Sequence, residues 1–98
     1  MNTFECKGKV WLYPGHAGWH FVTVPKITSK RIMKDFSDLK RGWGSLQVKV
    51  TVGKTSWDTS IFPDSKRGAY LLPIKSEVRK KEDITVDSII SYTLTIKV

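Results

Sequence analysis

The clearest structural signal in the chain is the stretch Leu46-Gln47-Val48-Lys49-Val50-Thr51-Val52. Apolar and polar residues alternate along it, so an extended strand would have one apolar and one polar face. The dipeptide Gly53-Lys54 follows, and residues 55–62 then form a second strand-like segment. Because glycine favours the tight turns that join antiparallel strands, the sequence predicts a β-hairpin here.

Four more strands are expected on either side of this hairpin. Residues 4–13 alternate, with a predicted inward face of Phe4, Cys6, Val10 and Leu12 and an outward face of Glu5, Lys7, Lys9, Trp11 and Tyr13. Residues 19–24 and 69–74 are short apolar strand candidates. Residues 89–98 form the closing strand, with a predicted inward face of Ile90, Tyr92, Leu94, Ile96 and Val98.

Two segments have helical spacing instead. In the first, Thr28 or Ser29 is expected to cap the helix and Gly42 to end it. The apolar residues between them lie three or four positions apart and comprise Ile32, Met33, Phe36 and Leu39. The second helix is expected over residues 75–82, with Val78 pointing inward.

Strands with one apolar face must close on themselves or stack as two sheets, because a single open sheet would leave that face in water. We therefore expect a mainly β fold, a small closed or split β-barrel of about six strands with two short helices. Two stacked sheets are the alternative. A chain of 98 residues has no room for a second core, so a single domain over residues 1–98 is predicted.

The amino-acid composition indicates in which cellular compartment the protein functions and which kinds of partner it can bind. Cys6 is the only cysteine, which excludes an internal disulfide and a cysteine-based zinc site and is typical of the reducing cytoplasm. The first residues do not resemble a signal peptide, and no apolar run is long enough to span a bilayer, so no membrane partner is expected. A net charge of +8 favours an anionic partner such as nucleic acid, or serves solubility alone.

Several motifs together resemble a known family. They are Trp19-His20-Phe21-Val22-Thr23-Val24-Pro25, Gly42-Trp43-Gly44-Ser45, Trp57-Asp58-Thr59-Ser60-Ile61-Phe62-Pro63 and Gly68-Ala69-Tyr70-Leu71-Leu72-Pro73-Ile74-Lys75. The chain resembles the prokaryotic domain-of-unknown-function family numbered 1905. This resemblance implies a bacterial source and a small split β-barrel, sometimes fused to a domain of the bacteriocin-protection type. It implies no biochemical role.

Two further points qualify the resemblance. Where members of the family tend to carry Gly-Asp, this chain has Val86-Asp87-Ser88, so that turn is expected to differ in type. Residues 71–90 are also similar in pattern to the DNA-binding barrels of the AbrB and MazE class. Because two chains form the barrel in that class, the similarity implies a homodimer as an alternative to a monomer.

No catalytic or metal-binding set is recognisable in the sequence. His16 and His20 lack a third ligand nearby, and Thr59 and Ser60 lack a neighbouring base that a third group orients. We therefore expect no enzyme activity, no metal and no cofactor. The predicted function is a binding or scaffold domain for an unidentified ligand or protein partner, which uses a cavity between the barrel and the first helix.

The alternative function is nucleic-acid binding by an aromatic and basic surface. The candidate residues for a ligand or nucleic acid are Trp11, Tyr13, Lys40, Arg41, Trp43, Lys66 and Arg67. Small barrels stack bases on aromatic side chains of this kind while cations contact the phosphates. The competing interpretation is that these large rings pack against the barrel and close its ends.

Overall fold

The computed structural model describes residues 2–15 and 18–98, which form a mainly β structure. Its strands are β1 (Thr3–Leu12), β2 (His20–Thr23), β3 (Leu46–Val52), β4 (Thr55–Asp64), β5 (Ala69–Pro73) and β6 (Ile89–Ile96). The helices are α1 (Lys26–Asp35) and α2 (Ser76–Lys81), and two 3₁₀ turns are η1 (Ser37–Leu39) and η2 (Gly42–Gly44). The predicted hairpin is confirmed, and its first strand has the predicted bounds.

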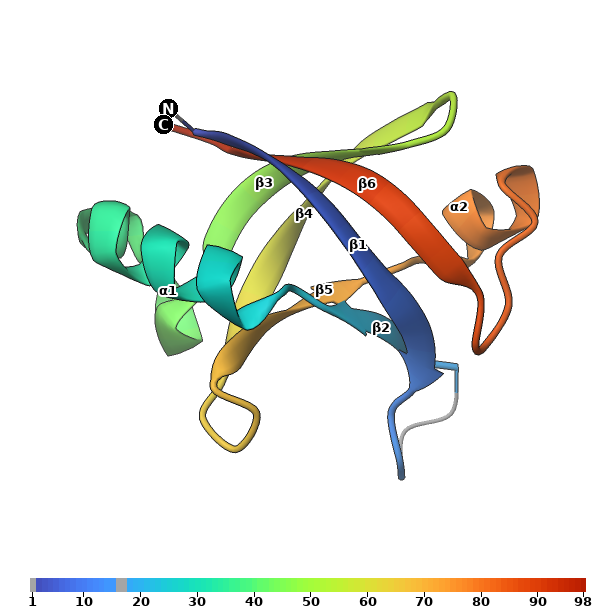
Figure 1. The fold of residues 1–98 in the computed structure, drawn as a ribbon, viewed down its shortest axis with the longest axis horizontal. Coiled ribbons are helices and arrows are strands. Elements are labelled where there is room, and N and C mark those ends of the chain that lie inside the picture. Colours follow the sequence, from blue (N-terminus) through green and yellow to red (C-terminus); the bar gives the residue numbers. More distant parts are fainter. Residues whose placement is uncertain (1, 16–17) are drawn as a thin grey trace.

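The strands close into a barrel in the order β1-β2-β5-β4-β3-β6, with antiparallel neighbours throughout (Figure 1). This confirms the predicted fold class. The ten-residue strands β1 and β4 each have two partners. Strand β1 pairs with β2 and β6, and strand β4 pairs with β3 and β5. A single chain completes the barrel, unlike the two-chain barrels of the AbrB and MazE class.

Gly8 lies where β1 passes from one partner strand to the other. Residues 3–9 pair with β6, and Val10 is the first residue paired with β2. A Cβ atom at Gly8 would lie 2.7 Å from Cγ2 of Val22, a fully buried side chain. Glycine therefore allows β1 to bend closely over β2 at this corner of the barrel.

We expect Gly8→Ala to lower the free energy of unfolding by about 1–3 kcal/mol, because the new methyl group overpacks the core against Val22. Gly42→Ala is the matched control, since a Cβ there has no neighbouring atom within 4 Å. Urea denaturation of both variants measures the difference. Equal stability of the two would contradict the close approach at Gly8.

The inward faces of the strands form one apolar core. Cys6, Val10 and Leu94 are buried as predicted and Phe4 is partly buried, whereas two residues assigned to inward faces are exposed. Leu12 is 49% exposed because β1 ends there at the rim of the barrel. Val98 is 86% exposed because β6 ends at Ile96, two residues earlier than predicted.

The first helix differs from its prediction at both ends. It begins at Lys26, directly after Pro25, and has no side-chain cap. Ser29, a predicted cap, instead lies inside the helix and is buried. Its hydroxyl group forms hydrogen bonds with main-chain groups of Val24 and Tyr70 and does not cap the helix. The helix ends at Asp35, and Gly42 instead begins the turn η2.

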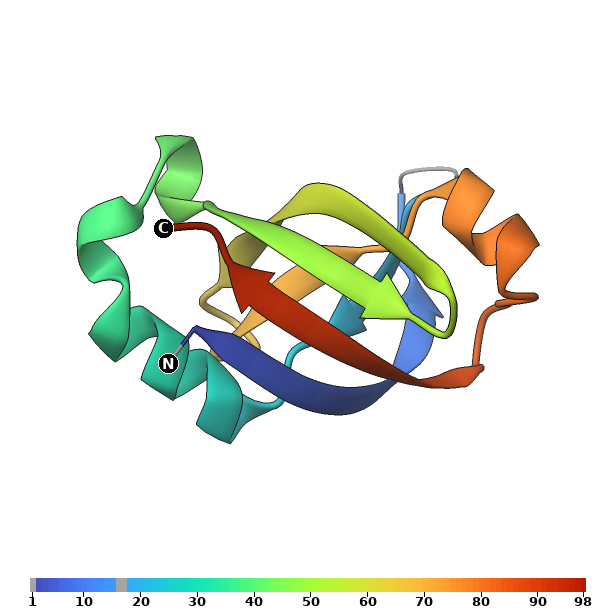
Figure 2. The same cartoon turned by 90° about the horizontal axis from the view of Figure 1, so that it is seen from above.

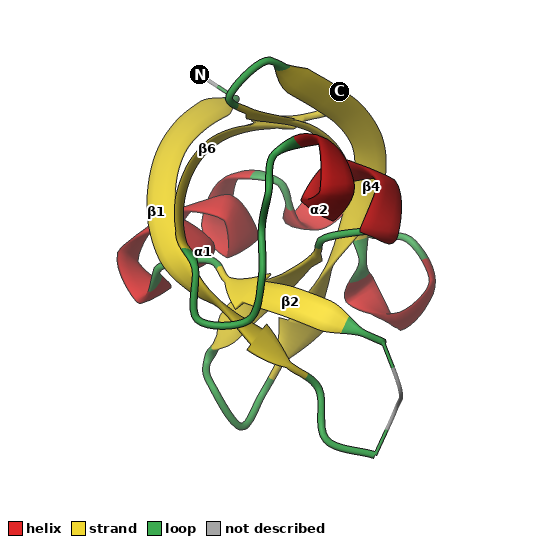
Figure 3. Ribbon diagram, turned by 90° about the vertical axis from the view of Figure 1, so that its right-hand side faces the viewer, coloured by secondary structure: helices red, strands yellow, loops and turns green. Residues whose placement is uncertain are grey.

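The helical segments lie at opposite ends of the barrel. Figures 1 and 2 place α1 and the two 3₁₀ turns at one end and α2 at the other. Figure 3 shows α2 in front of the barrel opening that faces the viewer. Val78 of α2 points inward as predicted and is 1% exposed. In the part of the chain that the structure describes, no helix is long and apolar enough to span a membrane.

Candidate binding cavity beside the second helix

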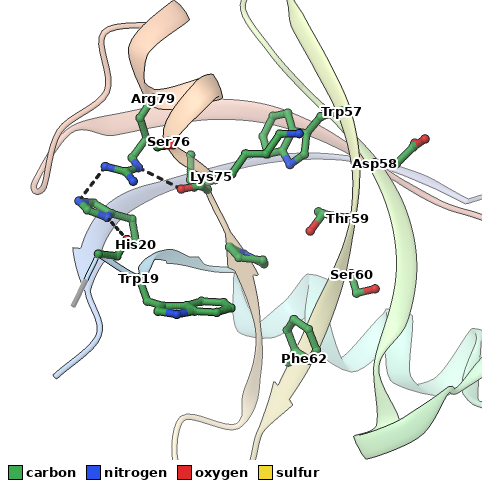
Figure 4. Close-up of a pocket in the computed structure, with 13 residues that line it drawn as sticks. Trp19, His20, Trp57, Asp58, Thr59, Ser60, Phe62, Lys75, Ser76 and Arg79 are labelled. Atoms are coloured by element: carbon green, nitrogen blue, oxygen red, sulfur yellow. Dashed lines mark hydrogen bonds between the residues drawn. The ribbon is translucent and has the colours of Figure 1, made fainter. Parts of the chain in front are cut away.

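A cavity of about 550 Å³ lies at the α2 end of the barrel. Residues from the start of β2, from β4 and from the segment joining β5 to α2 line it (Figure 4). Smaller hollows surround the barrel, including one of about 410 Å³ beside α1, where the sequence analysis expected the binding cavity. The α2 cavity is the stronger candidate because it combines aromatic walls with convergent polar groups.

Strand alternation determines which side chains of β4 face this cavity. Trp57 and Ile61 point inward and are buried, and Thr59 lies between them on the same face. In Figure 4, Thr59 lies on the cavity side of the strand, while the hydroxyl group of Ser60 points away from it. Thr59 therefore belongs to the inward face of β4.

Arg79 and His20 form the polar side of the cavity. The main-chain N–H of Ile74 donates to the carbonyl of His20 (2.9 Å), which fixes the start of α2 beside β2. Arg79 Nε donates to the carbonyl of Ile74 (3.1 Å), and Arg79 Nη1 lies 3.4 Å from His20 Nε2. The guanidinium group is thus held from two sides at the cavity wall.

These contacts fix the tautomer of His20. An arginine guanidinium only donates hydrogen bonds, so His20 Nε2 is the acceptor and carries no proton. The proton then lies on Nδ1, which donates to the carbonyl of Gly18 (2.9 Å). His20 therefore links Gly18 to Arg79, with both ring nitrogens engaged.

The charge of the cavity is positive. Lys75 and Arg79 both line it, and Asp58 is the acidic residue among the described lining residues. The carboxylate of Asp58 points away from the cavity in Figure 4 and pairs with Lys97 Nζ at 3.1 Å. Asp58 consequently does not neutralise the two cations that line the cavity.

An aromatic cluster extends outward from the cavity. Trp19 is half exposed and stacks on Phe21, with ring centroids 5.6 Å apart. Phe21 also contacts Trp11 (5.5 Å) and Tyr13 (5.6 Å). Arg67 lies over the ring of Trp11, 4.2 Å from its centroid, in a cation–π contact.

The structure therefore brings together Trp11, Tyr13 and Arg67 of the predicted site, with Lys66 in the same turn. The guanidinium of Arg67 covers one face of Trp11, and Arg67 also pairs with Asp64. This ion pair, with main-chain hydrogen bonds, holds the pKa of Asp64 below its usual range. Trp11 and Tyr13 are partly buried and contact each other and Phe21.

Lys40, Arg41 and Trp43 do not join that cluster. They lie on and between the 3₁₀ turns η1 and η2, at the α1 end of the barrel. The side chain of Trp43 is 94% exposed, so it is not packed against the other predicted aromatic residues. The turn η2 nevertheless adjoins the turn that carries Lys66 and Arg67, because a Cβ atom at Gly44 would lie 3.2 Å from Cγ of Pro63.

The sequence analysis missed the main components of the cavity, namely Trp19, Phe62, Lys75 and Arg79. His20 and Arg79 are 59 positions apart, and only closure of the barrel brings them together. One sequence feature could have pointed to this region. Alternation at Trp19, His20 and Phe21 places a polar histidine on one face of the strand and two aromatic residues on the other.

Other chemically reactive groups are buried or dispersed. Cys6 is a free, buried thiol paired across the strands with Tyr92, and burial raises its pKa. Within residues 2–15 and 18–98, no three His, Cys, Asp or Glu side chains are grouped to hold a metal. His16, weighed above as a ligand, lies outside the described residues.

Comparison with known proteins places this fold in a family. No curated protein matches the chain. A family model described as "Domain of unknown function (DUF1905)" matches residues 7–94, which include every strand of the barrel at least in part. The chain belongs to this family of domains of unknown function.

Proposed function

We propose that this domain is a non-catalytic binding module, and that its α2 cavity holds a small anionic ligand with a flat apolar ring. The observation that carries the proposal is that Lys75 and Arg79 line the same cavity as Trp19, Trp57 and Phe62. A flat ring fits against Trp19 and Phe62, and the anionic group fits the two cations.

Arg79 supports this assignment because it is oriented before any ligand arrives. Two of its nitrogens already bond to Ile74 and His20, which leaves other guanidinium N–H donors available. A side chain held in this way loses little conformational freedom when it binds a carboxylate or phosphate.

The hydrogen bonds of His20 favour binding over catalysis. A hydroxyl nucleophile such as Thr59 needs a base that accepts its proton. His20 Nε2 accepts from Arg79 and Nδ1 donates to Gly18, so this imidazole is not arranged as that base.

Titration with defined probes tests the proposal. Indole-3-acetate and adenosine 5′-monophosphate are anionic ring compounds, and tryptamine and adenosine are controls that lack the negative charge. We expect the anionic probes to bind more tightly than their controls when binding is measured by isothermal titration calorimetry. If neither anionic probe binds at millimolar concentration, the proposal is wrong.

Arg79→Gln is expected to weaken binding of the anionic probes about 10-fold or more, because a hydrogen bond to a charged group contributes about 1.5–3 kcal/mol. Lys80→Gln is the matched control, since Lys80 is an exposed neighbour on α2 and does not line the cavity. Thermal unfolding verifies that both variants fold. Equal affinities for the two variants would place the anion elsewhere.

A further inference from the structure

Trp43 is the most exposed large apolar side chain among the described residues, and its backbone is unusual. It lies at the centre of η2 with φ 63° and ψ 15°, in the left-handed region that favours glycine. Its side chain is 94% exposed. The fold therefore tolerates a strained backbone at a residue whose ring contributes almost nothing to the core.

Hydrogen bonds hold the turn that carries this ring. Gly44 N–H donates to the carbonyl of Arg41 (2.9 Å), and Arg41 N–H donates to the carbonyl of Ser45 (2.8 Å). The buried Ser45 donates through its hydroxyl group to the carbonyl of Gly42 (3.0 Å). Trp43 is thus presented to solvent by an ordered turn rather than by a loose loop.

Glycine at position 43 would satisfy this turn with less strain, so folding does not account for the tryptophan. Strained residues persist where the surrounding structure enforces them, and they gather at binding sites. Tryptophan is also among the residues most enriched where binding energy is concentrated. Both points favour contact with a partner outside the chain.

The surroundings of Trp43 carry positive charge. Lys40 and Arg41 directly precede its turn, and with Lys97 they line a hollow of about 350 Å³. Asp38 is the acidic residue in the lining. The adjacent helix α1 adds further exposed cations, Lys26, Lys30, Arg31 and Lys34 (Figure 2).

We propose that Trp43, Lys40 and Arg41 form a docking site for single-stranded nucleic acid, in which a base stacks on Trp43 and the two cations contact phosphates. Every base has a flat face, and stacking on an exposed aromatic ring needs no surrounding apolar surface. In a protein–protein interface, a tryptophan of this kind is usually surrounded by further contact residues that exclude water from it. Glycines and cations flank Trp43, which favours the nucleic acid.

Fluorescence anisotropy with a labelled 15-nucleotide oligothymidylate tests this site on the full chain. We expect binding at 50 mM salt and clearly weaker binding at 200 mM salt, because phosphate contacts release counterions. Trp43→Gly should weaken binding about 5-fold or more, in line with the loss of base stacking. The same variant should unfold at a temperature equal to or higher than wild type, which separates loss of binding from loss of folding.

A control outside both sites distinguishes a specific contact from general attraction to positive charge. Lys80→Gln removes an exposed cation of α2 that lines neither the α2 cavity nor the hollow beside Lys40 and Arg41. This variant should bind the oligonucleotide as wild type does. The inference is overturned if the oligonucleotide does not bind at 50 mM salt, or if Trp43→Gly binds it with unchanged affinity. It is also overturned if phosphatidylserine vesicles bind through Trp43 and the oligonucleotide does not.

Discussion

Replacing Leu94 with alanine is expected to lower the free energy of unfolding by about 2–5 kcal/mol, because the substitution leaves a cavity in a closely packed core. Leu94 is fully buried in the interior of the barrel. Its strand β6 pairs with β1 on one side and β3 on the other, where Leu94 faces Phe4 and Val50. The barrel offers little room to collapse around the missing atoms, since strands flank the site on both sides.

Ile89→Ala is the matched control for this prediction. Ile89 belongs to the same strand, but its side chain is 64% exposed at the barrel rim. Its removal should cost less than about 1 kcal/mol, as is usual for exposed positions. Urea denaturation followed by tryptophan fluorescence measures both variants. A similar loss for the two would show that the interior face of β6 is not packed as described.

The elements predicted best were those whose pattern is local. In β3, alternation and the following Gly53-Lys54 turn indicated both the strand and its inward face, and the structure has the same bounds. Strand ends were less accurate, because Leu12 and Val98 continue an apolar pattern beyond the region that pairs within the barrel. Hydrophobic period alone does not tell where pairing stops.

The candidate site was predicted only in part, for a related reason. Trp11 and Tyr13 lie two positions apart on one strand, so alternation already placed them together. Arg67 joins them from a distant turn, and the sequence analysis included it only for its charge. The contact between His20 and Arg79 depends on β2 pairing with β5, which brings α2 over the barrel opening. The spacing of apolar residues along the sequence does not predict that β2 pairs with β5.

Ser29 is the position where sequence and structure differ most instructively. The sequence indicated an N-terminal cap, which is the usual role of serine near a helix start. In the structure its hydroxyl group donates to the carbonyl of Val24 (3.1 Å) and accepts from the main-chain N–H of Tyr70 (3.0 Å). Both contacts are buried, so Ser29 joins α1 to β5 through the core.

Ser29→Ala is therefore expected to lower the free energy of unfolding by about 2–4 kcal/mol, because it deprives two buried main-chain groups of this partner and each unpaired group costs about 1–3 kcal/mol. Tyr70→Phe is the matched comparison. The Tyr70 hydroxyl is buried and has no hydrogen-bond partner among the described residues, so its removal should leave stability unchanged or raise it by about 1 kcal/mol. If the Ser29 bonds hold α1 on the barrel, urea denaturation shows a loss of stability for Ser29→Ala and none for Tyr70→Phe. A stable Ser29→Ala variant would instead mean that water or a shift of α1 satisfies the same main-chain groups.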